Sequence, residues 1–538
     1  MTTATSALGT VHEEPVIPLE YDPWVARGRE IEALSEGTFD IVVVGGGITG
    51  AAIADLASRR GLRTALVERT DFAAGASSMS SKMLYAGLRY LEPGHAGVAR
   101  GALRARGRLF QELGPSWIAP TPFLLPLPES SSERRRVRFG SWVDQRFGGR
   151  RNLGPRRILS AAEFRARVPQ FDAARSRPTL LFTEGVTDDA HLVLYLIQRA
   201  RRSGAQVLNH LEAVKIEEEG GKVTALGVQD RMQSKAFGIR ARSVISACGP
   251  WGSPWLIREE QPPVPPPTKG IHLVFRRSRL PLDAAIVLRA KDDRRVFALP
   301  YGQLLLVGTT ERDYPGPIES VRPERDEVNY LLEVVRDHFP SFHPDARDIV
   351  DAFAGVRPSL GAPPAPRAEN PPEGLVETGP IGVLSVVGAR LTTHRALAER
   401  VLERASVARG RSSARPDGQW SPAFPPRGDR KAPGAGADHL VTTVDGPFVQ
   451  WPARLTPWVE SAIRDTQAMT LEDLLDRRFH ALTRFEPTFT AVIRAVSRLG
   501  RGMLGWSDPE RGRQESEYQA HLAWLREEVV AAVGSSDP

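Results

Sequence analysis

The 538-residue sequence predicts an α/β + α protein, with a Rossmann-like domain, an antiparallel-sheet domain and a C-terminal helical domain. Three observations predict this fold class. An apolar strand pattern at 40–44 leads through clustered glycines into a helical pattern at 50–61, and a second strand pattern follows at 63–68. Alternating segments between about 265 and 350 indicate antiparallel strands. Apolar residues at three- and four-residue spacing after 455 indicate helices.

Composition along the chain predicts the domain boundaries. Residues 1–37 are polar and interrupted by Pro and Gly, so we expect a loosely held N-terminal extension. Residues 38–404 carry both the Rossmann-like and the antiparallel patterns. Residues 405–438 are rich in Arg, Ser, Pro and Gly, as is typical of a linker, and residues 439–538 are expected to form the helical domain.

Overall composition narrows the class of protein. With 41% apolar and 25% charged residues, the chain is typical of a soluble globular protein. We expect no membrane-spanning helix and no secretory signal, because the chain lacks an 18-residue apolar run and its start lacks a basic segment with an apolar core. The single cysteine, Cys248, excludes an internal disulfide and fits the reducing cytoplasm. The net charge of +7 suits anionic substrates or lipid surfaces, and we expect no nucleic-acid partner.

The glycine cluster predicts a dinucleotide site. Gly45, Gly47 and Gly50 have the G-x-G-x-x-G spacing, which permits a tight turn, a close approach of backbone to pyrophosphate, and close packing of helix on strand. The following helix presents free N–H groups and a positive dipole end to the phosphates. Glu68 ends the second strand, where its carboxylate can accept ribose hydroxyls. Nicotinamide and flavin enzymes share this motif, and its N-terminal placement favours a flavin.

The same stretch carries a family resemblance. Residues 40–92, "DIVVVGGGITG" through "LRYLE", closely resemble the opening of FAD-dependent glycerol-3-phosphate dehydrogenases, in the D-amino-acid-oxidase-like (DAO-like) group of flavoproteins. The resemblance continues in order through "TDDAHLVLYLIQRA", "SACGPW", "TKGIHLVF", "RVFALPYGQLLLVGTTE" and "LSVVGARLTTHRALAE", and resumes more weakly at "LEDLLDRRFHAL". It implies an FAD-binding domain and a substrate domain with an antiparallel sheet, interleaved over residues 38–404 with substrate-domain strands mainly at 265–350, and a helical cap. The implied reaction is oxidation of sn-glycerol 3-phosphate to dihydroxyacetone phosphate by hydride transfer to flavin N5, with electrons passed to quinone or another acceptor.

The resemblance also implies site residues. Substrate contacts fall at Arg89, Tyr90, His272, Arg357 and Arg367. Arginine binds phosphate oxygens bidentately but is a poor base, so His272 is assigned the proton transfer, with Arg357 and Arg89 as the other catalytic residues. The implied FAD contacts are Gly45, Gly47, Ile48, Thr49, Gly50, Glu68, Arg69, Ser77, Ser78, Ser81, Lys82, Val214, Gly249, Gly388, Arg390, Leu391, Thr392 and Thr393. No metal is expected. Plainer interpretations stay open: solvated arginines, a structural histidine, and a core valine at 214.

The chain departs from the family near the flavin ring. It has Tyr85-Ala86-Gly87 where the family reads His-Gly-Gly, and Gly388-Ala389-Arg390 where it reads Gly-Gly-Lys. Because these changes avoid the pyrophosphate motif, FAD binding is expected to persist while the substrate stays open. Two alternatives therefore remain: a divergent FAD-dependent oxidoreductase or oxidase of another hydroxy or amino acid, and a catalytically weak flavin-binding protein.

Location and assembly follow from weaker signals. The basic segment 134–157, with Phe139, Trp142 and Phe147 interleaved, is a candidate for peripheral contact with the anionic inner face of the cytoplasmic membrane. A solvated basic segment is the open alternative. A cytoplasmic chain is expected either way, and a homodimer is a further open possibility.

Overall fold

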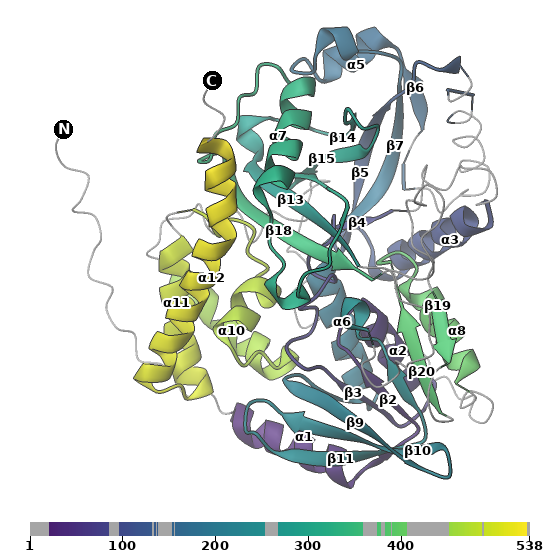
Figure 1. The fold of residues 1–538 in the computed structure, drawn as a ribbon, viewed down its shortest axis with the longest axis vertical. Helices are drawn as coiled ribbons and strands as arrows, with labels where there is room; N and C mark the ends of the chain where they lie inside the picture. The colour runs from purple at the N-terminus through teal and green to yellow at the C-terminus, as the bar shows by residue number, and fades with distance from the viewer. Residues whose placement is uncertain are drawn as a thin grey trace, which may run out of the picture.

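The fold was analysed in a computed structural model of the chain. The residues that the structure describes are 21–85, 96–131, 134–135, 137, 153–154, 156–252, 267–358, 374–377, 382–388, 390–405, 451–486 and 489–534. They form three sheets with surrounding helices, and a further set of helices packs along one side (Figure 1).

The Rossmann-like part is a six-stranded sheet in the order β19-β20-β12-β2-β3-β8. Its strands are β2 (Ile41–Val44), β3 (Thr64–Val67), β8 (Gln206–Leu208), β12 (Val244–Ser246), β19 (Gly374–Glu377) and β20 (Val383–Val387). Neighbouring strands are parallel except for β19, which runs antiparallel to β20. A parallel sheet is covered on both faces, which explains the unbroken apolar run of β2.

The two faces of β2 meet different layers. Ile41 and Val43 pack with the helices α2 (Ile48–Arg59), α6 (Asp189–Arg202) and α8 (His394–Arg404). Val42 and Val44 pack against a second sheet, in the order β1-β11-β10-β9. Its strands are β1 (Thr38–Phe39), β9 (Leu211–Glu219), β10 (Lys222–Asp230) and β11 (Ala236–Ala241).

The N-terminal extension contains a helix that the sequence analysis did not predict. Helix α1 (Pro23–Glu36) begins at Asp22, whose side chain caps it, and it buries Leu34 in the core beneath the second sheet. Its Arg27 is buried and pairs with Asp230 at 2.7 Å. The expected loose extension is therefore wrong for residues 23–36, because this helix has a buried face.

The substrate domain is a ten-stranded sheet. Its main strands are β5 (Ile118–Pro126), β7 (Thr179–Thr187), β13 (Thr268–Arg276), β14 (Ala285–Arg289), β15 (Arg295–Tyr301) and β16 (Leu304–Gly308), and β18 (Ile349–Arg357) pairs with β13. The short strand β4 (Met83–Leu84) pairs with β7 at one edge. Helix α7 (Arg325–His338) packs its apolar side on this sheet. The strands at 268–308 fall within 265–350, where antiparallel strands were expected, and β5, β7 and β18 extend the sheet beyond that range.

Helices follow at the C-terminal end, as the periodicity predicts. They are α10 (Trp451–Thr466), a π-helical turn (Asp473–Arg478), α11 (Phe489–Leu504) and α12 (Asp508–Gly534). Helix α12 lies beside α7 and β18 of the ten-stranded sheet domain (Figure 1). The π-helical turn packs against α6, which covers the six-stranded sheet, so the C-terminal region contacts both domains. The expected linker 405–438 lies outside the described residues, apart from Ala405 at the end of α8. No helix in the described part of the chain is both long enough and apolar enough to cross a membrane.

Candidate active site

Glycines shape the turn between β2 and α2. Gly45 has φ +107°, and a Cβ there would lie 2.5 Å from the carbonyl oxygen of Ala247. At Gly50 a Cβ would lie 1.9 Å from the carbonyl oxygen of Gly45, so only glycine allows the helix to approach the strand this closely. Gly47 precedes the first helical residue, Ile48, whose N–H donates to Ser77 Oγ at 2.9 Å. The turn therefore presents the N-terminus of α2 to an anion, as a pyrophosphate site requires.

Glu68 is held beside this turn. One carboxylate oxygen accepts the Gly46 N–H at 2.6 Å, and the other accepts the N–H and hydroxyl of Thr70 at 2.9 and 3.1 Å. Its neighbour Arg69 pairs with Glu319 from the substrate domain. The carboxylate is thus fixed at the end of β3, where a ribose would lie.

A cavity of about 1310 Å³ opens over these groups. Among the expected cofactor contacts, those that line it are Gly45, Gly47, Ile48, Thr49, Glu68, Arg69, Ser77, Gly249 and Gly388. Its size exceeds the roughly 300–1,000 Å³ of small-ligand pockets, as an extended dinucleotide needs. The Val214 side chain is exposed on β9, so it is not the core valine of the plainer interpretation. The adjacent Ala213 lines the cavity, and a backbone contact of Val214 with FAD stays a prediction.

His272 lies on β13 next to the cavity wall. Its Nε2 lies 2.9 Å from Ser81 Oγ, and its ring stacks on Phe353, with centroids 4.9 Å apart and planes 16° apart. Phe353 itself lines the cavity. Thus Ser81, expected to touch the flavin, also contacts the candidate base.

The environment keeps His272 neutral. Burial, and then the positive charges of Arg357 and Lys82, lower the pKa of His272 to about 3. Its Nδ1 is buried and has no hydrogen-bond partner among the described residues. Arg357 ends β18, which pairs with β13. The register sets Arg357 opposite Thr268 and Phe353 opposite His272, so a neutral imidazole and a guanidinium lie on adjacent strands, and the charge of the guanidinium acts on the imidazole.

Lys82, an expected FAD contact, has polar partners inside the protein. It is fully buried, and its Nζ donates to Asp189 Oδ1 at 2.7 Å, to the Ser78 carbonyl oxygen at 2.6 Å and to His480 Nε2 at 3.0 Å. It is not among the residues that line the cavity, so a contact of its ammonium group with FAD stays a prediction. The charge is used inside the protein, against a carboxylate of α6 and a histidine of the C-terminal region.

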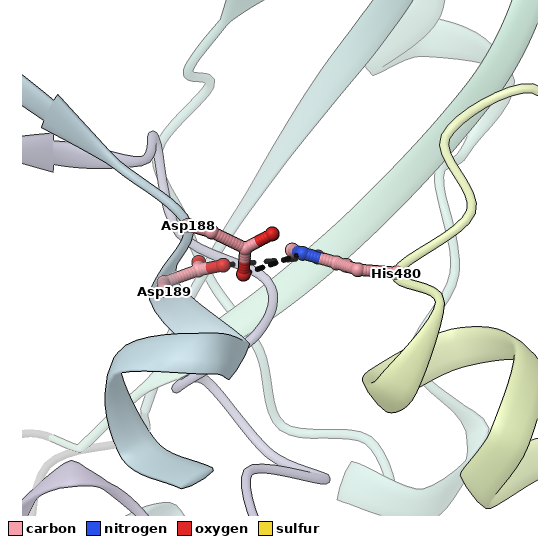
Figure 2. Close-up of side chains that lie close together, drawn as sticks. All are labelled: Asp188, Asp189 and His480. Atoms are coloured by element: carbon pink, nitrogen blue, oxygen red, sulfur yellow. Dashed lines mark hydrogen bonds and ion pairs between the residues drawn. The ribbon is translucent and has the colours of Figure 1, made fainter. Parts of the chain in front are cut away.

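The same cluster could be mistaken for a metal site. Figure 2 shows Asp188, Asp189 and His480 converging, with their ligand atoms within 4.8 Å of one another. Because Lys82 donates to His480 Nε2, the imidazole hydrogen lies on Nδ1 and is donated to Asp188 Oδ1 at 2.9 Å. The lysine ammonium thus occupies the position that a metal cation would take.

The turn from Gly388 to Thr393 closes the other side of the site. Gly388 has φ +76°, and the hydroxyl of Thr392 donates to the Tyr85 carbonyl oxygen at 3.0 Å. The ring of Tyr85 packs edge-on to Phe297, with centroids 6.3 Å apart. Both departures from the family pattern, at Tyr85 and at 388–390, therefore adjoin one another. The remaining expected contacts of this turn are Arg390, Leu391 and Thr393, which directly precede α8, with Thr393 at its N-cap.

Three expected substrate residues, Arg89, Tyr90 and Arg367, lie outside the described residues. Conversely, the cavity wall includes residues that the sequence analysis missed: His210, Trp251, Glu319, Thr470, Glu472, Asp473 and Arg477. The "LEDLLDRRFHAL" segment was noted only as a helix with a weak resemblance. Its run of alternating charges gave no sign that it reaches a cofactor cavity.

The fold and the site together define an FAD-dependent oxidoreductase. Residues 40–404 match the family model described as DAO, FAD dependent oxidoreductase. The aerobic glycerol-3-phosphate dehydrogenase of Staphylococcus saprophyticus is 32% identical over 378 residues, which cover 69% of this chain and 67% of that protein. The corresponding Bacillus subtilis protein is 30% identical over 388 residues, covering 70% and 68%. The chain belongs to the DAO family of FAD-dependent oxidoreductases, and FAD is its cofactor.

Solved structures agree with this fold. A glycerol-3-phosphate dehydrogenase from Bacillus halodurans, complexed with FAD, superposes with a TM-score of 0.71 at 24% identity, covering 93% of this chain and 98% of that one. Glycine oxidase from Geobacillus kaustophilus gives a TM-score of 0.52 at 20% identity, covering 70% and 96%. The residues of this chain fit FAD: the glycine turn would hold its pyrophosphate, the Glu68 carboxylate would hold its ribose, and the cavity is large enough for a dinucleotide.

Proposed function

We propose that this protein oxidises sn-glycerol 3-phosphate to dihydroxyacetone phosphate. The observation that carries the proposal is the juxtaposition of His272 and Arg357 beside the FAD cavity: one is a neutral proton acceptor and the other a phosphate-binding cation. The names of the Staphylococcus saprophyticus and Bacillus subtilis relatives support the same substrate.

Each residue has a defined task in this reaction. Arg357 binds phosphate oxygens through its planar fork, aided by Arg89, Tyr90 and Arg367. His272 takes the hydroxyl proton at Nδ1, provided that Nε2 carries the ring hydrogen and donates it to Ser81 Oγ. When the phosphate dianion pairs with Arg357, it offsets one of the cations that lower the pKa of His272, so substrate binding strengthens the base.

Bound FAD supplies the two-electron acceptor for the carbinol hydride, and the electrons then leave to a quinone or another acceptor. The buried wall of β13 and β18 keeps water from His272, which is 3% exposed. Positioning and water exclusion are therefore what the protein itself contributes.

Tyr85 favours a second candidate function. It stands where the resembling family has histidine. Its ring packs against Phe297, and its carbonyl oxygen accepts from Thr392. An FAD-dependent oxidoreductase or oxidase of a different hydroxy or amino acid is the alternative.

Anaerobic reduction separates the two. Glycerol 3-phosphate should bleach the flavin absorbance near about 450 nm, while glycerol, glycine and lactate at equal concentration should not. Arg357→Met should raise the concentration for half-reduction by about 10- to 100-fold, the loss expected for a charge-assisted hydrogen bond. Arg279→Met, at an exposed arginine paired with Asp348, is the matched control and should leave it unchanged. Bleaching by an amino or hydroxy acid, but not by glycerol 3-phosphate, refutes the proposed substrate.

Membrane contact through 134–157, a cytoplasmic location and homodimer formation stay predictions. Cosedimentation with vesicles containing anionic lipid, against neutral vesicles, tests the first. Most of that basic segment lies outside the described residues.

A further inference from the structure

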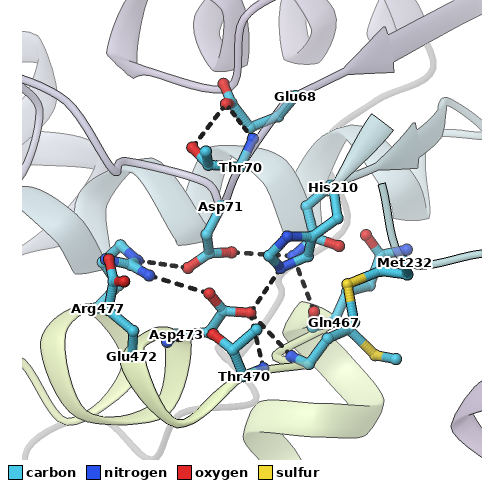
Figure 3. A network of polar contacts seen from close by, with 12 residues as sticks. Glu68, Thr70, Asp71, His210, Met232, Gln467, Thr470, Glu472, Asp473 and Arg477 are labelled. Carbon is cyan, nitrogen blue, oxygen red and sulfur yellow. Dashed lines mark hydrogen bonds and ion pairs between the residues drawn. The ribbon is translucent and has the colours of Figure 1, made fainter. Parts of the chain in front are cut away.

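The loop that follows β3 connects the FAD cavity to the C-terminal helices. Glu68 at its start faces the glycine turn and holds Thr70 through two hydrogen bonds. Three residues beyond Glu68, Asp71 is fully buried on the side of the C-terminal region (Figure 3). The loop therefore presents one carboxylate to the cofactor site and another to a different part of the chain.

Asp71 is bound almost entirely by residues from far along the sequence. Its carboxylate accepts from Arg477 Nε at 2.6 Å and from Arg478 at 2.5 and 2.8 Å. Asn209 Nδ2 donates to it at 2.9 Å. Both arginines belong to the π-helical turn and are nearly inaccessible, so two cations meet one carboxylate in the interior.

Asp473 supplies the second negative charge. It accepts from Arg477 NH2 at 2.9 Å within the π-helical turn, and from His210 Nε2 at 2.8 Å across the interface between this turn and the β8–β9 connection (Figure 3). Burial opposes a charge on His210, but the attraction and hydrogen bond of Asp473 outweigh it, so the pKa of His210 is raised. The cluster thus contains charges of both signs that satisfy one another only when the helices are docked.

The backbone ties this cluster to Glu68. The His210 N–H donates to the Thr70 carbonyl oxygen at 2.7 Å, and the Leu211 N–H donates to the Glu68 carbonyl oxygen at 2.7 Å. Residues of the cluster also form the cavity wall, since Thr470, Asp473 and Arg477 line the same cavity as Glu68. A shift of the π-helical turn must therefore move either the ribose-binding carboxylate or the wall beside it.

We propose that the C-terminal helical region controls FAD retention through this cluster: docking of the π-helical turn on Asp71 holds Glu68 in its cofactor-binding position. FAD binding and docking are then thermodynamically coupled, so each stabilises the other by the same factor. Asp71, Asp473, Arg477 and Arg478 act as positioning residues, because they hold the loop of Glu68 without themselves carrying out chemistry.

A matched pair of variants tests this role. Asp71→Asn removes a buried carboxylate from the loop that follows β3 (the FAD loop). This carboxylate is the one that Arg477 and Arg478 of the C-terminal region bind. Glu327→Gln is the control, because Glu327 is a buried carboxylate of α7 that accepts from the Thr310 hydroxyl at 2.9 Å and pairs with the buried Lys269 at 2.6 Å, and none of these three residues lines the cavity. Both changes should destabilise the fold, but only the first lies on the FAD loop.

The measured quantity is the dissociation constant of FAD for the full-length apoprotein, followed by flavin fluorescence. We expect Asp71→Asn to raise it by about 5- to 150-fold, the usual range of coupling between two sites, and Glu327→Gln to change it by less than about threefold. Equal effects of the two variants, or an unchanged affinity for Asp71→Asn, overturn the proposal.

A second measurement needs no variant. Amide hydrogen exchange of the wild-type protein with and without FAD should show slower exchange at 469–479 when FAD is bound, because of reciprocal coupling. This result is required even if Asp71→Asn does not fold. Slower exchange at 45–50 shows that FAD has bound. If exchange at 469–479 is then unchanged, the proposal is overturned.

Discussion

Replacement of Lys82 by methionine tests the buried cluster of Figure 2 most directly. Methionine keeps most of the apolar stem and removes the ammonium group, so Asp189 loses its cation while both sites remain 0% exposed. The Ser78 carbonyl oxygen and His480 Nε2 each lose a donor as well. The change is therefore electrostatic rather than a loss of volume.

The structure sets the size of the effect. At an effective dielectric constant of about 20, charges separated by the observed 2.7 Å attract by about 6 kcal/mol, which is an upper limit. Removal of one partner from a buried pair usually costs about 3–5 kcal/mol, because the remaining charge stays desolvated. We expect Lys82→Met to lower the free energy of unfolding by about 3–5 kcal/mol. Adding Asp189→Asn should recover part of this loss, since no unpaired charge then remains.

Urea unfolding of the apoprotein, followed by tryptophan fluorescence and far-UV circular dichroism, measures the change. Lys291→Met is the matched control: Lys291 is exposed and paired with the exposed Glu333, so its midpoint should match that of the wild type. The reasoning is refuted if Lys82→Met unfolds at the wild-type urea concentration. If that variant keeps its stability but no longer takes up FAD, Lys82 contacts the cofactor, as the family resemblance implied.

Three further predictions concern single sites. Gly45→Ala should abolish FAD uptake, measured as the flavin-to-protein absorbance ratio, because the added Cβ meets the carbonyl oxygen of Ala247 at 2.5 Å and φ is +107°. Burial lowers the pKa of His394 to about 4, so the unfolded chain binds its proton first and stability falls as pH drops below the ordinary value of 6.5. Between pH 7.5 and 5.5 this histidine should lower the free energy of unfolding by about 1.3 kcal/mol, measured by urea unfolding. His394→Gln should remove this loss, whereas the control His343→Gln, at an exposed site, should not. Burial raises the pKa of Cys248 to about 11, so at pH 8 iodoacetamide should alkylate the native apoprotein about 200-fold more slowly than the urea-unfolded chain; equal rates would contradict this.

The parts of the site that were predictable depend on local sequence. The G-x-G-x-x-G spacing places Gly45 and Gly50 within one turn, and Glu68 at the end of the next strand, so neighbours along the chain determine the geometry. His272 and Arg357 were found through a family resemblance. No periodicity in the sequence shows that their strands pair, because 85 residues separate them and pairing is a tertiary property.

The position of Lys82 shows why the rest was not predictable. A lysine that follows serines near a phosphate-binding turn is typical of an anion contact. Its actual partner His480 lies 398 residues away, and nothing near Lys82 in the sequence indicates that histidine. Arg478 similarly lies 407 residues from Asp71. In "LEDLLDRRFHAL" the same charges are equally compatible with a solvated helix face, so only the folded chain distinguishes the two.

Residues 477–484 bind carboxylates in three separate parts of the fold. Arg477 and Arg478 bind Asp71 in the FAD loop, His480 donates to Asp188 at the start of α6, and Arg484 binds Asp351 on β18. Apolar contacts tolerate small sliding movements, but a buried ion pair that loses its geometry leaves a desolvated charge, so these three attachments allow little displacement. Because Asp71 belongs to the cofactor domain and Asp351 to the sheet that carries His272, one short segment fixes the distance between the FAD cradle and the candidate base. The proposed hydride transfer is sensitive to that distance, which gives a physical reason for placing so many charges in the interior of this segment.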